Sequence, residues 1–105
     1  MDQESVVMLT KKYAELVRQS MPVRQVILYG SYAKGTAVPD SDIDVAVIVD
    51  ELDTDYLDQQ IKLFKLRRSI DLRIEPVLIE YREDRSGFLK EIMQTGYVIY
   101  PPIEH

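Results

Sequence analysis

The spacing of apolar residues divides the first half of the chain into helical and extended stretches. Gln3 to Gln19 carries apolar side chains at helical intervals, which predicts a helix that ends before Met21-Pro22. Val23 to Tyr29 and Ile43 to Val49 are runs of β-branched and apolar residues that are typical of strands. Because Ile43 to Val49 is almost continuously apolar, we expect it to be a central strand, buried on both faces.

The second half of the chain repeats this alternation. Asp55 to Ile70 is expected to form a long helix, Arg73 to Ile79 a strand, and Ser86 to Thr95 a shorter helix whose first residue is a candidate N-cap. Gly96 is a candidate helix stop, and Tyr97 to Tyr100 is expected to add an edge strand before two prolines. The order of elements predicts an α/β fold, a small mixed β-sheet packed with helices, in one domain of residues 1–105.

The helix predicted over Asp55 to Ile70 has a wider apolar surface than one sheet contact requires. Its apolar residues form two neighbouring stripes, Leu57, Ile61 and Phe64 in one and Tyr56, Leu63, Leu66 and Ile70 in the other. Packing on a sheet uses an apolar face of about 100°. The excess is either buried between the sheet and the terminal elements or kept for a partner protein, and the sequence favours neither.

The stretch from Gly30 to Asp44, GSYAKGTAVPDSDID, combines glycine, a hydroxyl and paired carboxylates. Gly30 follows a strand and allows close approach of a ligand, and Ser31 offers a hydroxyl and an N–H at a predicted helix start, which suits phosphate oxygens. Asp42 and Asp44 are two residues apart on a strand and therefore point to the same face. Two such carboxylates repel each other unless a cation lies between them, and Mg²⁺ or Mn²⁺ prefers oxygen ligands. The stretch therefore predicts a phosphate-binding turn beside two divalent ions.

Composition limits the chemistry that is available. The 105 residues include no cysteine, and the one histidine is His105, so disulfides and thiolate chemistry are excluded and a histidine-based triad or zinc site is poorly supported. A formal net charge of −5 argues against direct binding of long nucleic acid. The lack of cysteine, of a signal peptide and of a membrane-spanning apolar run favours a cytoplasmic location.

With these residues the chain resembles the minimal nucleotidyltransferases of the DNA polymerase β superfamily. The pattern of that group is an apolar residue, a glycine, and a glycine or serine, followed after a spacer by two acidic residues that alternate with apolar ones. It is represented here by Tyr29-Gly30-Ser31 and by Asp42-Ile43-Asp44-Val45. The resemblance covers Val23 to Ile79 and implies a polymerase β-type nucleotidyltransferase core.

The resemblance also implies a third carboxylate on the next core strand. Asp71 and Glu75 both have the required strand parity. We favour Glu75, because it lies inside the predicted strand, where a carboxylate without a role is hard to explain. Relatives more often carry aspartate there, so the glutamate is a departure that bears on its role as a base. By resemblance, Asp42, Asp44 and Glu75 hold two Mg²⁺ or Mn²⁺ ions, and Glu75 helps to deprotonate the acceptor hydroxyl.

Other contacts with the nucleotide follow from the same resemblance. Gly30 and Ser31 would contact the β- and γ-phosphates. Lys34 either adds a phosphate contact or is simply exposed. Arg73 shares strand parity with Glu75 and either neutralises charge at the site or forms an ion pair with a neighbouring acidic residue.

Three functions are compatible with these residues. Minimal members of the family are commonly paired with small all-helical HEPN-type proteins in toxin–antitoxin-like systems, in which the nucleotidyltransferase adds AMP to its partner. The resemblance therefore implies metal-dependent transfer of a nucleoside monophosphate, AMP from ATP, to such a partner. The alternative is a non-catalytic antitoxin module that binds nucleotide or partner, since no acceptor-binding domain is present. Transfer to a small molecule is a third option, for which a homo-oligomer would have to supply the pocket.

Overall fold

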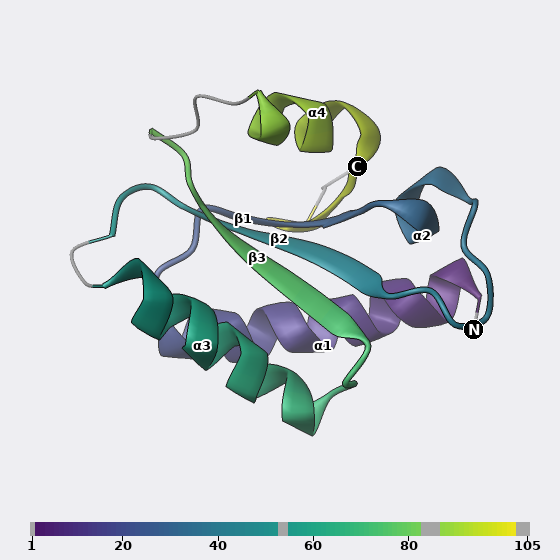
Figure 1. Cartoon of the computed structure of the whole chain (residues 1–105), viewed down its shortest axis with the longest axis horizontal. Coiled ribbons are helices and arrows are strands. Elements are labelled where there is room, and N and C mark those ends of the chain that lie inside the picture. Colours follow the sequence, from purple (N-terminus) through teal and green to yellow (C-terminus); the bar gives the residue numbers. More distant parts are fainter. Residues whose placement is uncertain (1, 53–54, 83–86, 103–105) are drawn as a thin grey trace.

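The computed structural model describes residues 2–52, 55–82 and 87–102, which form helices on both faces of one sheet (Figure 1). The elements in chain order are α1 (Gln3–Ser20), β1 (Gln25–Tyr29), α2 (Ser31–Lys34), β2 (Ile43–Val49), α3 (Tyr56–Leu66), the 3-10 helix η1 (Arg67–Ser69), β3 (Ile74–Glu80), α4 (Phe88–Thr95) and β4 (Tyr97–Tyr100). This alternation confirms the predicted α/β fold class.

The four strands form a mixed sheet in the order β3-β2-β1-β4. β1 is antiparallel to both β2 and β4, whereas β2 and β3 are parallel and are connected through α3. β2 therefore has a strand on each side, and all of its residues except Asp44 are buried. The continuous apolar run that predicted a central strand is confirmed.

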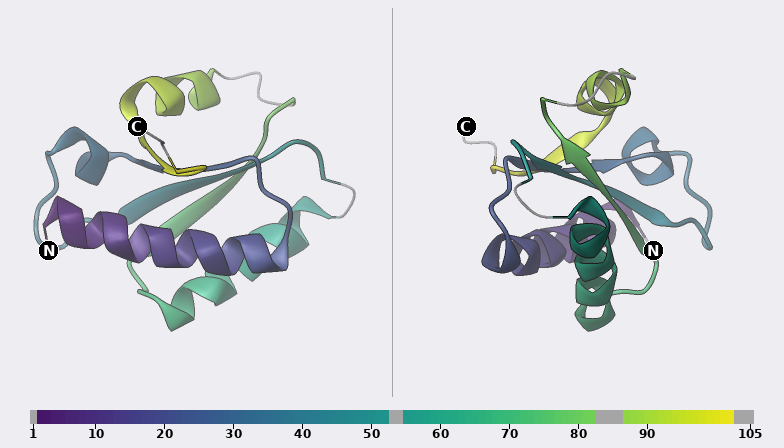
Figure 2. Two further views of the ribbon diagram at one scale, coloured as in Figure 1. Left: turned by 180° about the vertical axis from the view of Figure 1, so that it is seen from behind. Right: turned by 60° about the vertical axis from the view of Figure 1, so that its left-hand side comes forward.

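Helices α1 and α3 cover one face of the sheet and α4 covers the other, as the two views of Figure 2 show. The larger core, under α1 and α3, includes the fully buried Tyr13 and Leu63. The Tyr13 hydroxyl donates to the backbone oxygen of Leu63 at 2.7 Å, which satisfies a buried phenol and joins α1 to α3. The smaller core, under α4, includes Ile27, Ile48 and Ile92.

Side chains of α3 cap the outer edge of β3. Tyr56 Oη donates to the backbone oxygen of Leu78 at 2.6 Å, and Gln60 Nε2 donates to that of Pro76 at 2.8 Å. The backbone N–H of Leu78 donates to Gln60 Oε1 at 2.9 Å. These bonds occupy groups that an exposed strand edge would offer to another chain. They also fix α3 against the strand that carries Glu75.

The predicted elements are present with small shifts at their ends. β1 begins at Gln25 rather than Val23, and α3 ends at Leu66 rather than Ile70 because its last turn tightens into η1. β3 is displaced by one residue toward the C-terminus. The glycine after α4 ends that helix as predicted, whereas the expected N-cap Ser86 lies outside the described residues. Within the described ranges, no helix has the length and apolarity needed to cross a membrane.

Candidate functional site

Tyr29, Asp44 and Glu75 form one row across three strands. Asp44 in β2 is paired with Tyr29 in β1 on one side and with Glu75 in β3 on the other. Paired residues of neighbouring strands point to the same face of a sheet. Here it is the face of α4, since the residues two positions along each strand belong to the core beneath that helix. The row therefore lies on the α4 side, where β1 ends and β2 and β3 begin.

Asp44 is close to both of the other predicted carboxylates. Burial raises the pKa of Asp44, and the negative charges of Asp42 and Glu75 raise it further. Asp42 is exposed and immediately precedes β2. The structure thus brings together the three acidic residues that the sequence singled out, in an arrangement whose mutual repulsion a cation would relieve.

The three carboxylates do not converge on a single point in this structure. Among the residues that the structure describes, no three acidic or histidine side chains are placed to hold a metal ion as they stand. Glu75 Oε1 instead accepts a long hydrogen bond of 3.4 Å from Arg67 Nη1. The Glu75 side chain is 44% exposed and lies beside Asp44 in the sheet register. The donor set, which consists only of anionic oxygens, fits a hard divalent cation.

Asp71, the other candidate for the third carboxylate, is held in an ion pair. Its oxygens accept from Arg73 Nη2 at 2.9 Å, from Arg73 Nε at 3.1 Å and from the backbone N–H of Arg73 at 2.8 Å. The hydrogen bond from the Arg73 side chain lowers the pKa of Asp71. Of the two roles considered for Arg73, the structure shows the ion pair with a neighbouring acidic residue. Since Glu75 is paired with Asp44 in the sheet and Asp71 precedes β3, the register favours Glu75 over Asp71.

Gly30 occupies a position that only glycine fits. Its φ of 74° and ψ of −150° fall in a region that other residues adopt only under strain. A Cβ at this position would collide with Asp44 Oδ2 and lie 3.1 Å from Asp44 Cγ. The close approach that the sequence predicted for a ligand is therefore made within the chain, by the Asp44 carboxylate.

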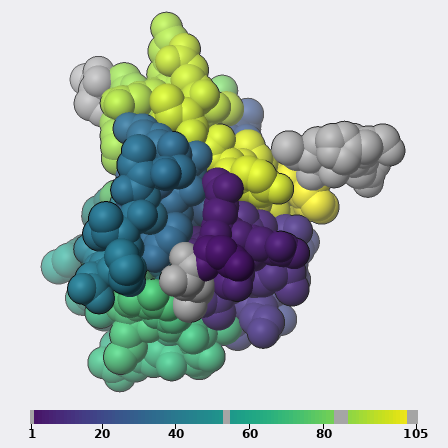
Figure 3. Space-filling view, turned by 90° about the vertical axis from the view of Figure 1, so that its right-hand side faces the viewer, coloured from purple at the N-terminus to yellow at the C-terminus, as the bar shows by residue number. Residues whose placement is uncertain are grey.

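Helix α2 begins directly after Gly30 and carries the other two predicted phosphate contacts. Ser31 is its first residue and is partly exposed, and Lys34 is its last and is exposed. Gln3 Nε2 donates to the backbone oxygen of Tyr32 at 3.0 Å and so attaches α2 to the first turn of α1. Figure 3 faces this end of the molecule, where the surfaces of α2 and the first turn of α1 adjoin. Because Ser31 directly follows Gly30, which lies against the Asp44 carboxylate, it is next to the carboxylate row.

Two residues that sequence reasoning did not assign to the site border the carboxylates. Burial, together with the charges of Asp44 and Glu75, raises the pKa of Tyr29 to about 12, so its phenol is neutral at physiological pH. Arg67 reaches Glu75 from η1, donates to the backbone oxygen of Ile74 at 2.9 Å and lies over the Phe64 ring. Tyr29 is placed beside the carboxylates by strand register, and Arg67 by packing around the edge of β3. Neither position follows from local sequence.

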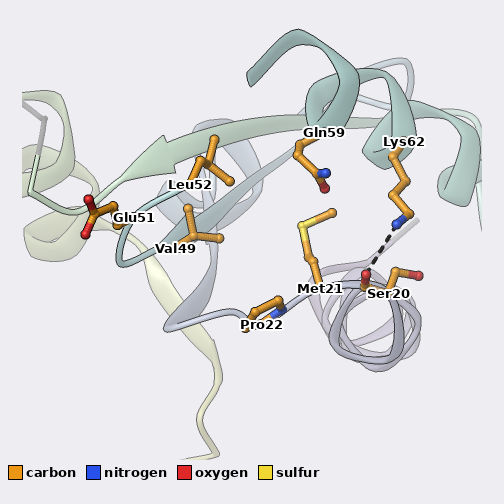
Figure 4. Close-up of a pocket in the computed structure, with 8 residues that line it drawn as sticks. All are labelled: Ser20, Met21, Pro22, Val49, Glu51, Leu52, Gln59 and Lys62. Carbon is orange, nitrogen blue, oxygen red and sulfur yellow. Dashed lines mark hydrogen bonds between the residues drawn. The ribbon is translucent and has the colours of Figure 1, made fainter. Parts of the chain in front are cut away.

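A hollow at the opposite end of β2 is separate from these residues (Figure 4). It lies between the end of α1, the end of β2 and α3, and is lined by Ser20, Met21, Pro22, Val49, Glu51, Leu52, Gln59 and Lys62. Lys62 Nζ donates to the backbone oxygen of Ser20 at 3.3 Å along one side of it. Val49 is the last residue of β2 and Asp44 the second, so about 16 Å of strand separates the hollow from the carboxylates.

Helix α3 keeps part of its wide apolar surface outside the core. Leu63 is fully buried, whereas Leu57 is 63% exposed and Ile61 is 44% exposed. The first explanation for the wide apolar surface was burial between the sheet and the terminal elements. That explanation is wrong for Leu57 and Ile61. A face kept for a partner remains a prediction.

The chain matches a known family over most of its length. Residues 11–104 match the family described as "Polymerase beta, Nucleotidyltransferase". The chain is also 34% identical over 74 residues to the "Putative protein adenylyltransferase MJ0141" of Methanocaldococcus jannaschii, a match that covers 69% of this chain and 74% of that protein.

Solved structures share the fold. A toxin–antitoxin crystallised with AMP-PNP aligns with a TM-score of 0.65 and 26% identity, over 86% of this chain and 72% of that one. A tri-AMPylated Shewanella oneidensis HEPN toxin in complex with MNT antitoxin aligns with a TM-score of 0.60 and 21% identity, over 90% of this chain and 71% of that one. From the family match and these likenesses, the chain belongs to the polymerase β nucleotidyltransferase family and is a nucleotidyltransferase.

Proposed function

We propose that this nucleotidyltransferase moves AMP from ATP to a hydroxyl of a small all-helical HEPN-type partner, using two Mg²⁺ or Mn²⁺ ions bound by Asp42, Asp44 and Glu75. The observation that carries the proposal is the position of Asp44, close to the other two carboxylates and against Gly30. The similarity to a protein named as an adenylyltransferase supports AMP as the group transferred. The similarity to a toxin–antitoxin with bound AMP-PNP supports ATP as the donor and a toxin as the partner.

Each residue of the site then has a distinct task. Gly30 and Ser31 hold the β- and γ-phosphates, since backbone N–H groups at the start of a helix suit anionic oxygens. Asp42 and Asp44, with Glu75 completing the set, would hold the divalent ions, which would supply positive charge to the triphosphate. Glu75 accepts the proton of the acceptor hydroxyl. The acceptor oxygen bonds to the α-phosphorus as the bond to the bridging oxygen of the β-phosphate breaks, and pyrophosphate leaves.

Labelled ATP tests the reaction and its need for metal. With Mg²⁺ and the candidate partner, label at the α-phosphate should appear on the partner, whereas label at the γ-phosphate should remain in pyrophosphate. Removal of divalent ions with EDTA should lower transfer by at least about 100-fold, because the phosphate charge is then left uncompensated. Gel autoradiography and intact mass measure both results. Transfer of the γ-label, or undiminished α-transfer in EDTA, would refute the proposal.

The choice of third carboxylate predicts a difference between two isosteric variants. Glu75→Gln should lower kcat at saturating ATP by about 100-fold, because it removes the proposed proton acceptor. Asp71→Asn should leave kcat within a few-fold of wild type, because the Asp71 carboxylate is bonded to Arg73 and not directed at Asp44. Steady-state kinetics of both variants decide between them. The reverse order of effects would assign the role to Asp71.

A binding module without catalysis is the second candidate. The observation that favours it is that Glu75 contacts Arg67 and that the three carboxylates do not converge among the described residues. In that case the chain would bind metal–ATP or its partner and restrain the toxin without transferring AMP. Asp44→Asn would then still restrain the partner's activity in a toxicity assay, whereas loss of restraint in that variant would support transfer.

A further inference from the structure

We propose that Tyr29 and Phe88 form an aromatic wall against which the base of the bound nucleotide stacks. This inference rests on the proposed nucleotide site and extends it from the phosphates to the base. Tyr29 is the last residue of β1, and Phe88 is the first residue of α4. The two residues are distant in the sequence. Tyr29 comes from the sheet, and Phe88 comes from the helix that covers this face of the sheet.

The position of the wall follows from the order of elements on this face. Gly30 and Ser31, at the end of β1, mark the phosphate end of the nucleotide. Asp44, one strand spacing of about 4.8 Å from Tyr29, marks the metal ions and the α-phosphate. The ribose and base continue beyond the α-phosphate, away from α2. Helix α4 is the element that covers this face of the sheet in Figure 2, so the base is expected to lie toward its first turn.

The geometry of the two rings suits a stacking partner. Their centroids are 5.7 Å apart and their planes are inclined by 85°, an edge-to-face pair. Such a pair leaves ring faces outside its own contact, and those faces are what a base requires. Phe88 is 37% exposed although it is a large apolar residue. A base stacked on this side chain would bury part of that exposed surface.

The chemistry of the wall determines which bases it favours. Stacking on aromatic side chains tolerates every base, because each has a π-face. Its strength increases with the area in contact, so purine nucleotides should bind more tightly than pyrimidine nucleotides.

Binding measurements without acceptor separate the base from the phosphates. Calorimetry with Mg²⁺ compares ATP with tripolyphosphate, which has the same phosphate groups and no base. Phe88→Ala should weaken ATP binding by about tenfold or more, leave tripolyphosphate binding unchanged, and reduce the preference for ATP over CTP. Met93→Ala removes an exposed apolar side chain farther along α4 and should change neither affinity.

The outcomes distinguish this inference from the function on which it rests. An equal loss of ATP and tripolyphosphate binding in Phe88→Ala would show a disturbed site without a contribution from the base, and would overturn the wall. Unchanged ATP binding in Phe88→Ala would overturn it as well, while transfer of AMP by the same protein would leave the proposed function intact. If the wild type bound neither ligand with Mg²⁺, both proposals would fail together.

Discussion

Replacement of Asp44 by asparagine should lower AMP transfer by at least about 1,000-fold, because the site loses several kcal/mol of charge stabilisation at its centre. Asp44 lies close to Asp42 and Glu75 and is the one residue of the buried strand β2 that is not itself buried. An amide has nearly the same shape but no charge, so it binds a divalent ion far more weakly than a carboxylate does. Transfer of α-labelled AMP to the partner, measured as an initial rate, gives the loss directly.

The same variant should be more stable than the wild type when no divalent ion is present. Below the ordinary pKa of 3.8, the Asp44 carboxyl is protonated in both the folded and the unfolded chain. As the pH rises through 3.8 toward the raised pKa of the folded state, the unfolded chain ionises more readily, and the fold loses stability. The penalty is present above the raised pKa of the folded state, and asparagine does not carry it. The Tm difference between variant and wild type in EDTA should therefore be positive at about pH 7 and diminish as the pH falls below 3.8.

A carboxylate at the other end of β2 provides the control. Asp50 is exposed and accepts from Arg24 Nη1 at 2.7 Å, an ion pair far from the site. Asp50→Asn should keep full transfer and should not gain stability. Addition of Mg²⁺ should raise the Tm of the wild type and of Asp50→Asn, and should not raise that of Asp44→Asn. An Asp44→Asn protein that is less stable than the wild type at neutral pH in EDTA would contradict the proposed repulsion.

The elements of this fold could be predicted because they depend on local patterns. The run from Ile43 to Val49 indicated the correct bounds of β2, since an uninterrupted apolar strand is typical of the centre of a sheet. Helix ends were less accurate, as at Leu66, where the change to 3-10 geometry depends on how the following turn packs. The order and register of the strands are long-range properties. The pairing of Asp44 with Glu75 could therefore be expected only from the resemblance, because spacing along the chain does not determine which strands lie side by side.

The residues of the candidate site also fall into two groups, those indicated by local sequence and those placed by long-range packing. Asp42 and Asp44 were singled out because their spacing is a local pattern, but only Asp44 lies in β2, so the prediction that both are on one strand is wrong for Asp42, which precedes β2. Tyr29 stands out in the sequence only as an apolar motif position, although register places it beside two carboxylates. Arg67 was missed because it reaches Glu75 around the edge of β3, through the fit of η1 against that strand. What the structure adds is the set of neighbours that each carboxylate has, and these neighbours suggest which variants separate catalysis from binding.

Replacement of Gly30 by alanine should destabilise the fold and abolish transfer together. The backbone at Gly30, with φ 74° and ψ −150°, costs a residue with a side chain about 1–3 kcal/mol. The new Cβ would also displace the Asp44 carboxylate, and such overpacking costs about 1–3 kcal/mol more. Urea unfolding should therefore show a loss of about 2–6 kcal/mol. Transfer should fall by at least about 100-fold even under conditions where the variant is fully folded, because Asp44 is moved from its place in the row.

Gly35 makes it possible to separate backbone strain from the contact with Asp44. It has a φ of 74° as well, yet a Cβ there would have no atom within 4 Å among the described residues. Gly35→Ala should therefore cost only about 1–2 kcal/mol of stability, from the left-handed backbone, and should keep transfer near the wild-type rate. If the two variants lost stability and transfer equally, the close approach of Asp44 to Gly30 would have no part in the site. A selective loss in Gly30→Ala would instead show that the glycine is needed to seat the Asp44 carboxylate against the turn that holds the phosphates.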